Sequence, residues 1–173
     1  MTGTSLGEGL ALRPYSASDR DWVASAHIAH YRSVERFDPS FDDVVWKALS
    51  DIDRRIEEDR TFGLVLEGSA DVHHGSIFLC DTGNSARIRL FYLDRQLHGE
   101  GLGRAMLLAA LEAARDSGFR QIEVSTFDTH AAACSLYART GFIEQARTRC
   151  ISFGRRMAQV DFVHDLVTER AVS

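Results

Sequence analysis

Hydrophobic residues recur with helical spacing in two stretches near the start of the chain. One stretch predicts a helix from about residue 19 to residue 33. A second helix is predicted to begin at Ser40, where Ser40 and Asp43 form a capping-box pattern. Its apolar positions are Phe41, Val44, Val45, Ala48, Leu49, Ile52 and Ile56. These apolar residues are interpreted as core packing, and the charged residues between them predict a solvated outer face.

Alternating and continuous apolar runs predict strands in the rest of the chain. The predicted strands are 10–14, 61–67, 75–80, 85–93, 121–126, 142–149 and 158–166, and two more helices are predicted at 105–115 and 131–140. A loop is expected between the last two strands, at 149–157. The strand, turn, helix and strand from residue 90 to residue 126 should place two strands parallel, because such a crossover returns the chain in the same direction. The order of elements therefore predicts a mixed α/β fold.

Composition adds bounds on the class of protein. The chain has 173 residues, which predicts a single domain at 10–173 after a disordered tail at 1–9. Its net charge of -5 argues against nucleic acid as a partner. The three cysteines have neither a disulfide nor a zinc-site spacing, so no metal is expected. No apolar run is long enough to cross a bilayer and no signal pattern opens the chain, so we expect a cytoplasmic protein that does not act at membranes.

A glycine-rich turn at 98–104 joins an apolar strand to an alanine-rich helix. Gly99, Gly101 and Gly103 alternate there. The backbone N–H groups of such a turn, together with the helix dipole, form an anion site. Arg104 stands where a P-loop has lysine and where a dinucleotide fingerprint has glycine, so both of those motifs are excluded. A tight turn without a ligand remains an alternative.

Two sequence blocks resemble the GCN5-related N-acetyltransferase (GNAT) family. The run His98-Gly-Glu-Gly-Leu-Gly103 is similar to the family's Gln/Arg-x-x-Gly-x-Gly/Ala, and His130-Ala-Ala-Ala-Cys-Ser-Leu-Tyr-Ala-Arg-Thr-Gly-Phe142 is similar to its Asn-x-x-Ala-x-x-Leu-Tyr-x-x-x-Gly-Phe. The resemblance covers nearly the whole chain. More narrowly, the chain resembles the acetyltransferase domain found fused to MarR-type regulators. That likeness lies in His27-x-x-x-Tyr31, Asp38-x-Ser40-Phe41, Arg89-Leu-Phe-Tyr-Leu93, Thr126-x-Asp128 and Ser152-Phe-Gly154.

The resemblance implies a fold, a reaction and a cofactor site. The fold is a strongly twisted mixed sheet of about six to seven strands with about four helices and a splayed central parallel pair. The reaction is acetyl transfer from acetyl-CoA, without a metal, to a primary amine of a small molecule or peptide by direct attack in a ternary complex. The cofactor-binding residues would be Phe91, Tyr92, Leu93, His98, Gly99, Glu100, Gly101, Leu102, Gly103, Arg104, His130, Ala133 and Tyr137.

Two histidines depart from the family pattern. His98 stands where the family usually has Arg or Gln, and His130 stands where it usually has Asn. A neutral imidazole can still hydrogen-bond a phosphate or an amide. We therefore expect weaker or more pH-dependent cofactor binding, not its loss.

The catalytic candidates are one phenol and several possible bases. Tyr137 could protonate the departing CoA thiolate, and the alternative is a packed tyrosine with a structural role. Some relatives have a Glu base at the position of Ser125, which cannot serve in that way. Glu123 and Asp128 are the candidate bases, with His27 or His30 of the first helix as further options.

The acceptor is expected to contact the first two helices and the loop at 149–157. Candidate contacts are His27, Tyr31 and Arg89, whose guanidinium could bind a substrate carboxylate or instead pair with Glu123. The alternative function is an acyl-CoA-binding sensor with little turnover. A homodimer is also possible.

Overall fold

The computed structural model describes residues 4–7 and 9–166. Its strands are β1 (Thr4–Gly7), β2 (Leu10–Pro14), β3 (Phe62–Glu67), β4 (His73–Asp81), β5 (Ser85–Leu93), β6 (Gln121–Phe127), β7 (Ile143–Ser152) and β8 (Arg155–Asp165). Its helices are α1 (Arg20–Ser33), α2 (Ser40–Glu58), α3 (Leu102–Asp116) and α4 (Ala131–Arg139). Within the described residues the strands form one sheet in the order β1-β2-β3-β4-β5-β6-β8-β7. The predicted mixed α/β fold is confirmed.

The eighth strand comes from the stretch that was predicted to be a disordered tail. Residues Thr4–Gly7 form β1, and Thr4 lies opposite Leu12 of β2 in an antiparallel pair. The disorder prediction is therefore wrong for residues 4–7. Small polar residues gave no hydrophobic signal there, whereas the backbone groups of β1 are paired by the edge of β2. Residues 1–3 and 8 lie outside the described residues.

The predicted loop at 149–157 is also wrong. Strands β7 and β8 continue through it, with Cys150 opposite Met157 and Ser152 opposite Arg155. Only Phe153 and Gly154 form the turn, and both have positive φ, as a two-residue hairpin that matches strand twist requires. The Phe153 carbonyl accepts a hydrogen bond from Asp38 N–H at 3.1 Å, so this hairpin tip is held against the segment between α1 and α2.

Helix α2 begins at Ser40 as predicted, but its cap and the start of α3 differ from the predictions. The Ser40–Asp43 capping box is absent, because the Asp38 carboxylate accepts the Ser40 N–H at 2.9 Å and the Ser40 hydroxyl. Asp38 therefore takes the capping role two residues earlier. Helix α3 begins at Leu102, three residues before the predicted start, because Gly101 ends the turn in a left-handed conformation.

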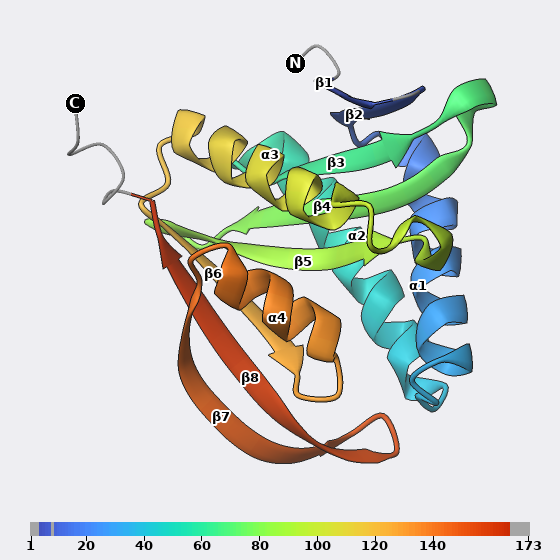
Figure 1. The fold of residues 1–173 in the computed structure, drawn as a ribbon, viewed down its shortest axis with the longest axis vertical. Helices are drawn as coiled ribbons and strands as arrows, with labels where there is room; N and C mark the ends of the chain where they lie inside the picture. The colour runs from blue at the N-terminus through green and yellow to red at the C-terminus, as the bar shows by residue number, and fades with distance from the viewer. Residues whose placement is uncertain (1–3, 8, 167–173) are drawn as a thin grey trace.

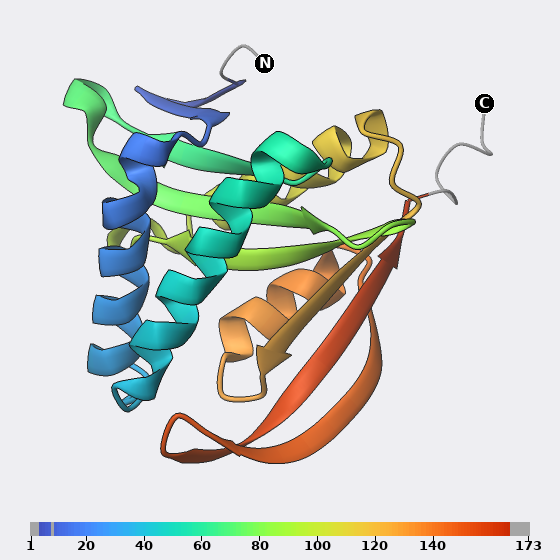
Figure 2. The same cartoon turned by 180° about the vertical axis from the view of Figure 1, so that it is seen from behind.

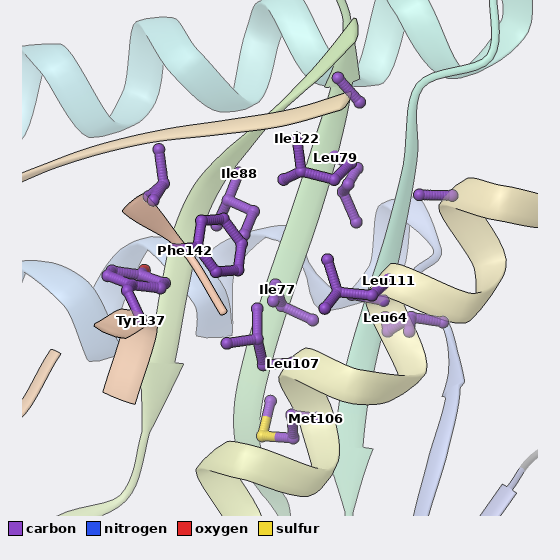
Figure 3. Packing of buried hydrophobic residues seen from close by; sticks show 14 of the residues in the cluster. Leu64, Ile77, Leu79, Ile88, Met106, Leu107, Leu111, Ile122, Tyr137 and Phe142 are labelled. Atoms are coloured by element: carbon purple, nitrogen blue, oxygen red, sulfur yellow. The ribbon is translucent and has the colours of Figure 1, made fainter. Parts of the chain in front are cut away.

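The helices cover the two faces of the sheet in pairs. Helices α3 and α4 lie on one face, in front in Figure 1, and α1 and α2 lie on the other, in front in Figure 2. Each pair encloses a separate apolar core. One core packs Ile88 and Ile122 of the sheet against Leu107 of α3 and also contains Tyr137 (Figure 3). The other packs α1 and α2 against Phe78 and Cys80 of β4.

The two central parallel strands separate soon after they begin. Strands β5 and β6 pair only from Ser85–Gln121 to Arg87–Glu123 and then diverge (Figure 1). At Leu90, φ is +45°, and the register of β4 against β5 shifts across Ser76–Phe78, which marks a bulge that bends β5. Strand β6 instead stays paired with β8 over its whole length. The result is a V-shaped opening in the middle of the sheet.

The packing of α3 predicts a stability difference between two adjacent leucines. Leu107 is 0% exposed and Leu108 is 39% exposed. Leu107→Ala should lower the free energy of unfolding by about 2–5 kcal/mol because it leaves a cavity against the sheet. Leu108→Ala should change it by less than about 1 kcal/mol. Urea denaturation followed by circular dichroism measures both, and equal losses would contradict this orientation of α3.

Candidate active site

The glycine turn follows β5 after a short 3-10 turn at Arg95–Leu97. Gly99 and Gly101 have φ values of +86° and +79°, and a Cβ at either position would meet no atom within 4 Å. Glycine is therefore needed there for backbone conformation and not because of crowding. The first helical hydrogen bond runs from Ala105 N–H to the Gly101 carbonyl at 3.0 Å. The N–H groups before Ala105 have no partner within the helix and can bind an anion.

Tyr137 projects from α4 into the core beside the other wall of the opening. Its side chain is 3% exposed, and its ring packs against Phe91, Phe142 and Phe162 with centroid separations of 6.5, 5.3 and 5.8 Å. Burial, with smaller contributions from Tyr31 and Cys134, raises the pKa of Tyr137 well above its ordinary value. The phenol therefore stays protonated throughout the neutral and mildly alkaline range, as a proton donor must.

A charged cluster that sequence reasoning missed lies near Tyr31 on the acceptor side. Glu35, in the segment between α1 and α2, has a side chain that is 14% exposed. Its Oε2 lies 3.4 Å from His130 Nε2 and 3.3 Å from Arg155 Nη1. The three residues come from three separate parts of the chain, and no local pattern marks Glu35. Only the tertiary structure brings these groups together.

Burial controls the ionisation of the imidazoles in this region. Burial lowers the pKa of His130, and the charge of Glu35 opposes that shift in part. Burial also lowers the pKa of His30, with Glu35 again opposing it. Both rings are therefore neutral at pH 7 and able to accept a proton.

Comparison with known families assigns this arrangement. Residues 26–142, more than half of the chain, match the model of the Acetyltransferase (GNAT) family. The chain belongs to the GNAT acetyltransferase family. It is therefore an acyltransferase, and the identification made from its two sequence blocks is confirmed. A comparison with curated protein sequences found no match.

Solved structures share the GNAT fold over nearly the full length. The acetyltransferase yncA from Salmonella typhimurium, solved with its cofactor acetyl-CoA, matches with a TM-score of 0.77 and 18% identity, covering 96% of this chain and 99% of that one. The ribosomal-protein-S5-alanine acetyltransferase from Vibrio fischeri matches with a TM-score of 0.77 and 12% identity, covering 97% and 98%. The dodecameric spermidine N-acetyltransferase from Vibrio cholerae matches with a TM-score of 0.71 and 15% identity, covering 96% and 100%. At these identities the likeness concerns the fold alone.

The predicted cofactor residues of this GNAT protein lie on β5, on the glycine turn with the start of α3, and at α4. The backbone of Phe91, Tyr92 and Leu93 forms the β5 edge of the opening, beyond the last rung shared with β6. Gly99, Glu100, Gly101, Leu102, Gly103 and Arg104 follow as the turn and first helical residues, while His130, Ala133 and Tyr137 lie on α4 or at its start. His98 is turned differently from the predicted phosphate contact, because its Nε2 hydrogen-bonds the Leu93 carbonyl at 2.9 Å.

The two carboxylates predicted as bases have other partners. Glu123 accepts a hydrogen bond from Arg87 Nη2 at 2.7 Å, on the last rung that β5 and β6 share. The alternative pairing of Glu123 with Arg89 is therefore wrong, and Arg87 takes that place. Asp128 accepts the Ala158 N–H at 2.8 Å and so fastens the end of β6 to β8. These contacts give both carboxylates structural roles.

The predicted acceptor residues divide between the surface and the core. Arg89 is partly exposed, and its Nη1 lies 4.0 Å from Asp51 Oδ2 of α2, so its guanidinium is only loosely paired. His27 is buried, donates from Nδ1 to the Val23 carbonyl at 2.8 Å, and contacts the rings of Tyr31 and Tyr92. Burial lowers the pKa of His27 to about 4. His27 therefore has a packing role, with its ring stacked against that of Tyr31.

Residues 4–7 and 9–166 contain neither a cluster of metal-ligating side chains nor a helix that could span a membrane. In this part of the chain, no three His, Cys, Asp or Glu side chains come together as a possible metal site. None of its helices is both long enough and apolar enough to cross a membrane.

The glycine turn predicts opposite stability effects at two nearby positions. Gly101→Ala should lower the free energy of unfolding by about 1–2 kcal/mol, because φ of +79° is strained for alanine. Gly103→Ala should raise it by about 0.4–1 kcal/mol, because this residue is helical and a Cβ there would lie 3.7 Å from Leu136. Urea denaturation of both variants decides this, and a stabilising Gly101→Ala would contradict the turn conformation.

Proposed function

We propose that the protein is an N-acetyltransferase that transfers an acetyl group from acetyl-CoA to a primary amine of a small molecule or peptide. The observation that carries this proposal is the V-shaped opening, with unpaired β5 backbone on one side, Tyr137 near its wall and the glycine turn at its end. Acetyl-CoA supplies the acyl group as a thioester, and no metal takes part.

The opening suits the extended arm of acetyl-CoA. Beyond Arg87, the N–H and C=O groups of β5 that face β6 have no strand partner, so an extended pantetheine can pair with them as an added strand would. The turn from Gly99 to Arg104 offers free N–H groups and open space for the pyrophosphate. Support for acetyl-CoA also comes from yncA of Salmonella typhimurium, which shares the fold and contains acetyl-CoA.

The proposed reaction is direct attack in a ternary complex. The amine nitrogen forms a bond to the acetyl carbonyl carbon, and the bond from that carbon to sulfur breaks. The sulfur leaves as a thiolate and takes a proton from the phenol of Tyr137. Burial keeps the phenol protonated at neutral pH, and an apolar site also disfavours a free thiolate, so the proton is donated to sulfur as the bond from carbon to sulfur breaks.

Tyr137→Phe tests the general acid. The variant should lose about 10- to 100-fold in kcat, because the thiolate must then be protonated by water. Its affinity for acetyl-CoA should stay within about twofold, because the ring and its packing remain. Thiol release with an amine panel measures kcat, and calorimetry measures binding. An unchanged kcat would show that Tyr137 has only a packing role.

The same measurements decide between the enzyme and a sensor. The alternative function is an acyl-CoA-binding module with little turnover. Wild-type protein that binds acetyl-CoA tightly but releases no thiol with any amine would favour that alternative. Thiol release that requires the amine supports the enzyme.

Several finer features stay predictions beside this function. Arg89 favours an acceptor that carries a carboxylate as well as an amine, because its guanidinium is partly exposed and its ion pair with Asp51 is long, at 4.0 Å. The likeness to domains fused to MarR-type regulators, a homodimer and a cytoplasmic location are further proposals. The roles of Glu123 and Asp128 as bases stay predictions from the sequence, and their partners Arg87 and Ala158 favour a different base. The dodecamer reported for spermidine N-acetyltransferase belongs to that protein.

A further inference from the structure

His130 occupies a position where the GNAT family usually has Asn, and its surroundings are those of a base. The residue immediately precedes α4, and its side chain is 11% exposed. Its Nδ1 lies 3.2 Å from Thr126 Oγ1, which fixes the ring plane. Its Nε2 is buried and has no hydrogen-bond partner among the described residues. A buried polar atom without a partner is costly, so a group that brings a hydrogen-bond donor or a proton to this nitrogen relieves that cost.

Glu35 faces that nitrogen from the other side of the site. The 3.4 Å separation between Glu35 Oε2 and His130 Nε2 becomes an ion pair as soon as the ring gains a proton. Arg155 Nη1 lies 3.3 Å from the same carboxylate oxygen and donates to the Glu35 backbone carbonyl. The arginine therefore holds Glu35 in place.

The cluster is linked to the proposed general acid through Tyr31. Tyr31 contacts His130 with a ring-centroid separation of 5.3 Å, and Tyr31 also acts electrostatically on Tyr137. His130 is the N-cap of α4 and Tyr137 lies further along this helix, so the same helix positions both residues.

We propose that His130 is the general base that removes the proton from the acceptor's ammonium group, and that Glu35 is a positioning residue that stabilises the resulting imidazolium. This inference rests on the proposed acetyl transfer and assigns the base for that reaction. Neither Glu123 nor Asp128 is needed for this step.

The proton balance of this step is complete. The ammonium group gives one proton to His130 Nε2 and becomes a neutral amine, which attacks the acetyl carbon. As the amide forms, the nitrogen releases one further proton, and the sulfur gains one from Tyr137, which is reprotonated through solvent. His130 then returns its proton to solvent, so one proton is released in each turnover.

The charges around His130 fix the direction of the pH dependence. The groups that face it are Glu35, which favours the protonated ring, and His30 and Arg155, which disfavour it; burial is the largest effect and lowers the pKa. The base works only when neutral. At saturating amine, kcat should therefore be constant at neutral pH and fall as pH drops through a midpoint below about 6.5.

A comparison of two amines separates the base from a structural role. His130→Asn should lower kcat about 100-fold with an aliphatic amine, which is protonated at neutral pH, but less than about threefold with an alkoxyamine, which is already neutral. The acidic limb should also disappear from the kcat profile. Equal losses with both amines, or a retained acidic limb, would overturn the proposal. Wild-type protein that acetylates neither amine would instead contradict the proposed function.

Glu35→Gln tests the positioning role, with Glu144→Gln as the matched control. Glu144 is exposed on β7 and pairs with Arg147 at 2.9 Å, so its variant makes the same charge change away from the cluster. Glu35→Gln should lower kcat with the aliphatic amine and shift the acidic limb to lower pH, because the imidazolium loses its anionic partner. Glu144→Gln should leave both unchanged. The same acidic limb in Glu35→Gln and wild type would overturn the role of Glu35.

An NMR titration of the His130 ring gives a readout that does not depend on turnover. In the wild-type chain, the ring should titrate below about pH 6.5, and in Glu35→Gln it should titrate lower still. An identical titration in both proteins would show that the carboxylate does not interact with the ring, which would overturn the pairing even if the enzyme is active.

Discussion

The separation of β5 from β6 is the constraint on which the rest of the structure depends. The two strands share only the rungs from Ser85 to Arg87, because β5 bends at Leu90 while β6 remains paired with β8. Backbone hydrogen-bonding groups in the middle of a sheet are normally paired. Here the β5 backbone beyond Arg87 faces an opening, and this unpaired edge is what an extended ligand can complete.

The elements around the opening contribute different chemical groups: backbone N–H groups, a phenol, an imidazole and a carboxylate. The left-handed Gly101 ends the turn that follows β5, so α3 begins at Leu102 with N–H groups that have no partner within the helix. Helix α4 adds a phenol that burial keeps protonated. The imidazole of His130 stands at the start of the same helix, and the segment after α1 adds the carboxylate of Glu35. The proposed proton donor and proton acceptor thus belong to one helix, and their opposite roles follow from burial and charge.

The charged cluster depends on contacts between parts that are distant in the sequence. Glu35 lies in the segment that caps α2 through Asp38, and Asp38 is in turn hydrogen-bonded to the hairpin tip at Phe153. The same hairpin supplies Arg155, which holds the Glu35 side chain. The β7–β8 hairpin is therefore part of the site, although its strands stand at the edge of the sheet.

The sequence by itself determined the class of fold, the glycine turn and the position of Tyr137. Periodicity is a local property, so the α-helices and all but one of the strands in the described part of the chain followed from it, and glycine is the residue that left-handed turns favour. Tertiary structure alone decided β1, whose polar residues form a strand because β2 pairs their backbone, and the continuous β7–β8 hairpin in place of a loop. It also decided that Glu123 pairs with Arg87 and that Glu35 faces His130. Such pairings depend on how strands diverge and helices pack, and residues that meet only through packing leave no pattern in a single sequence.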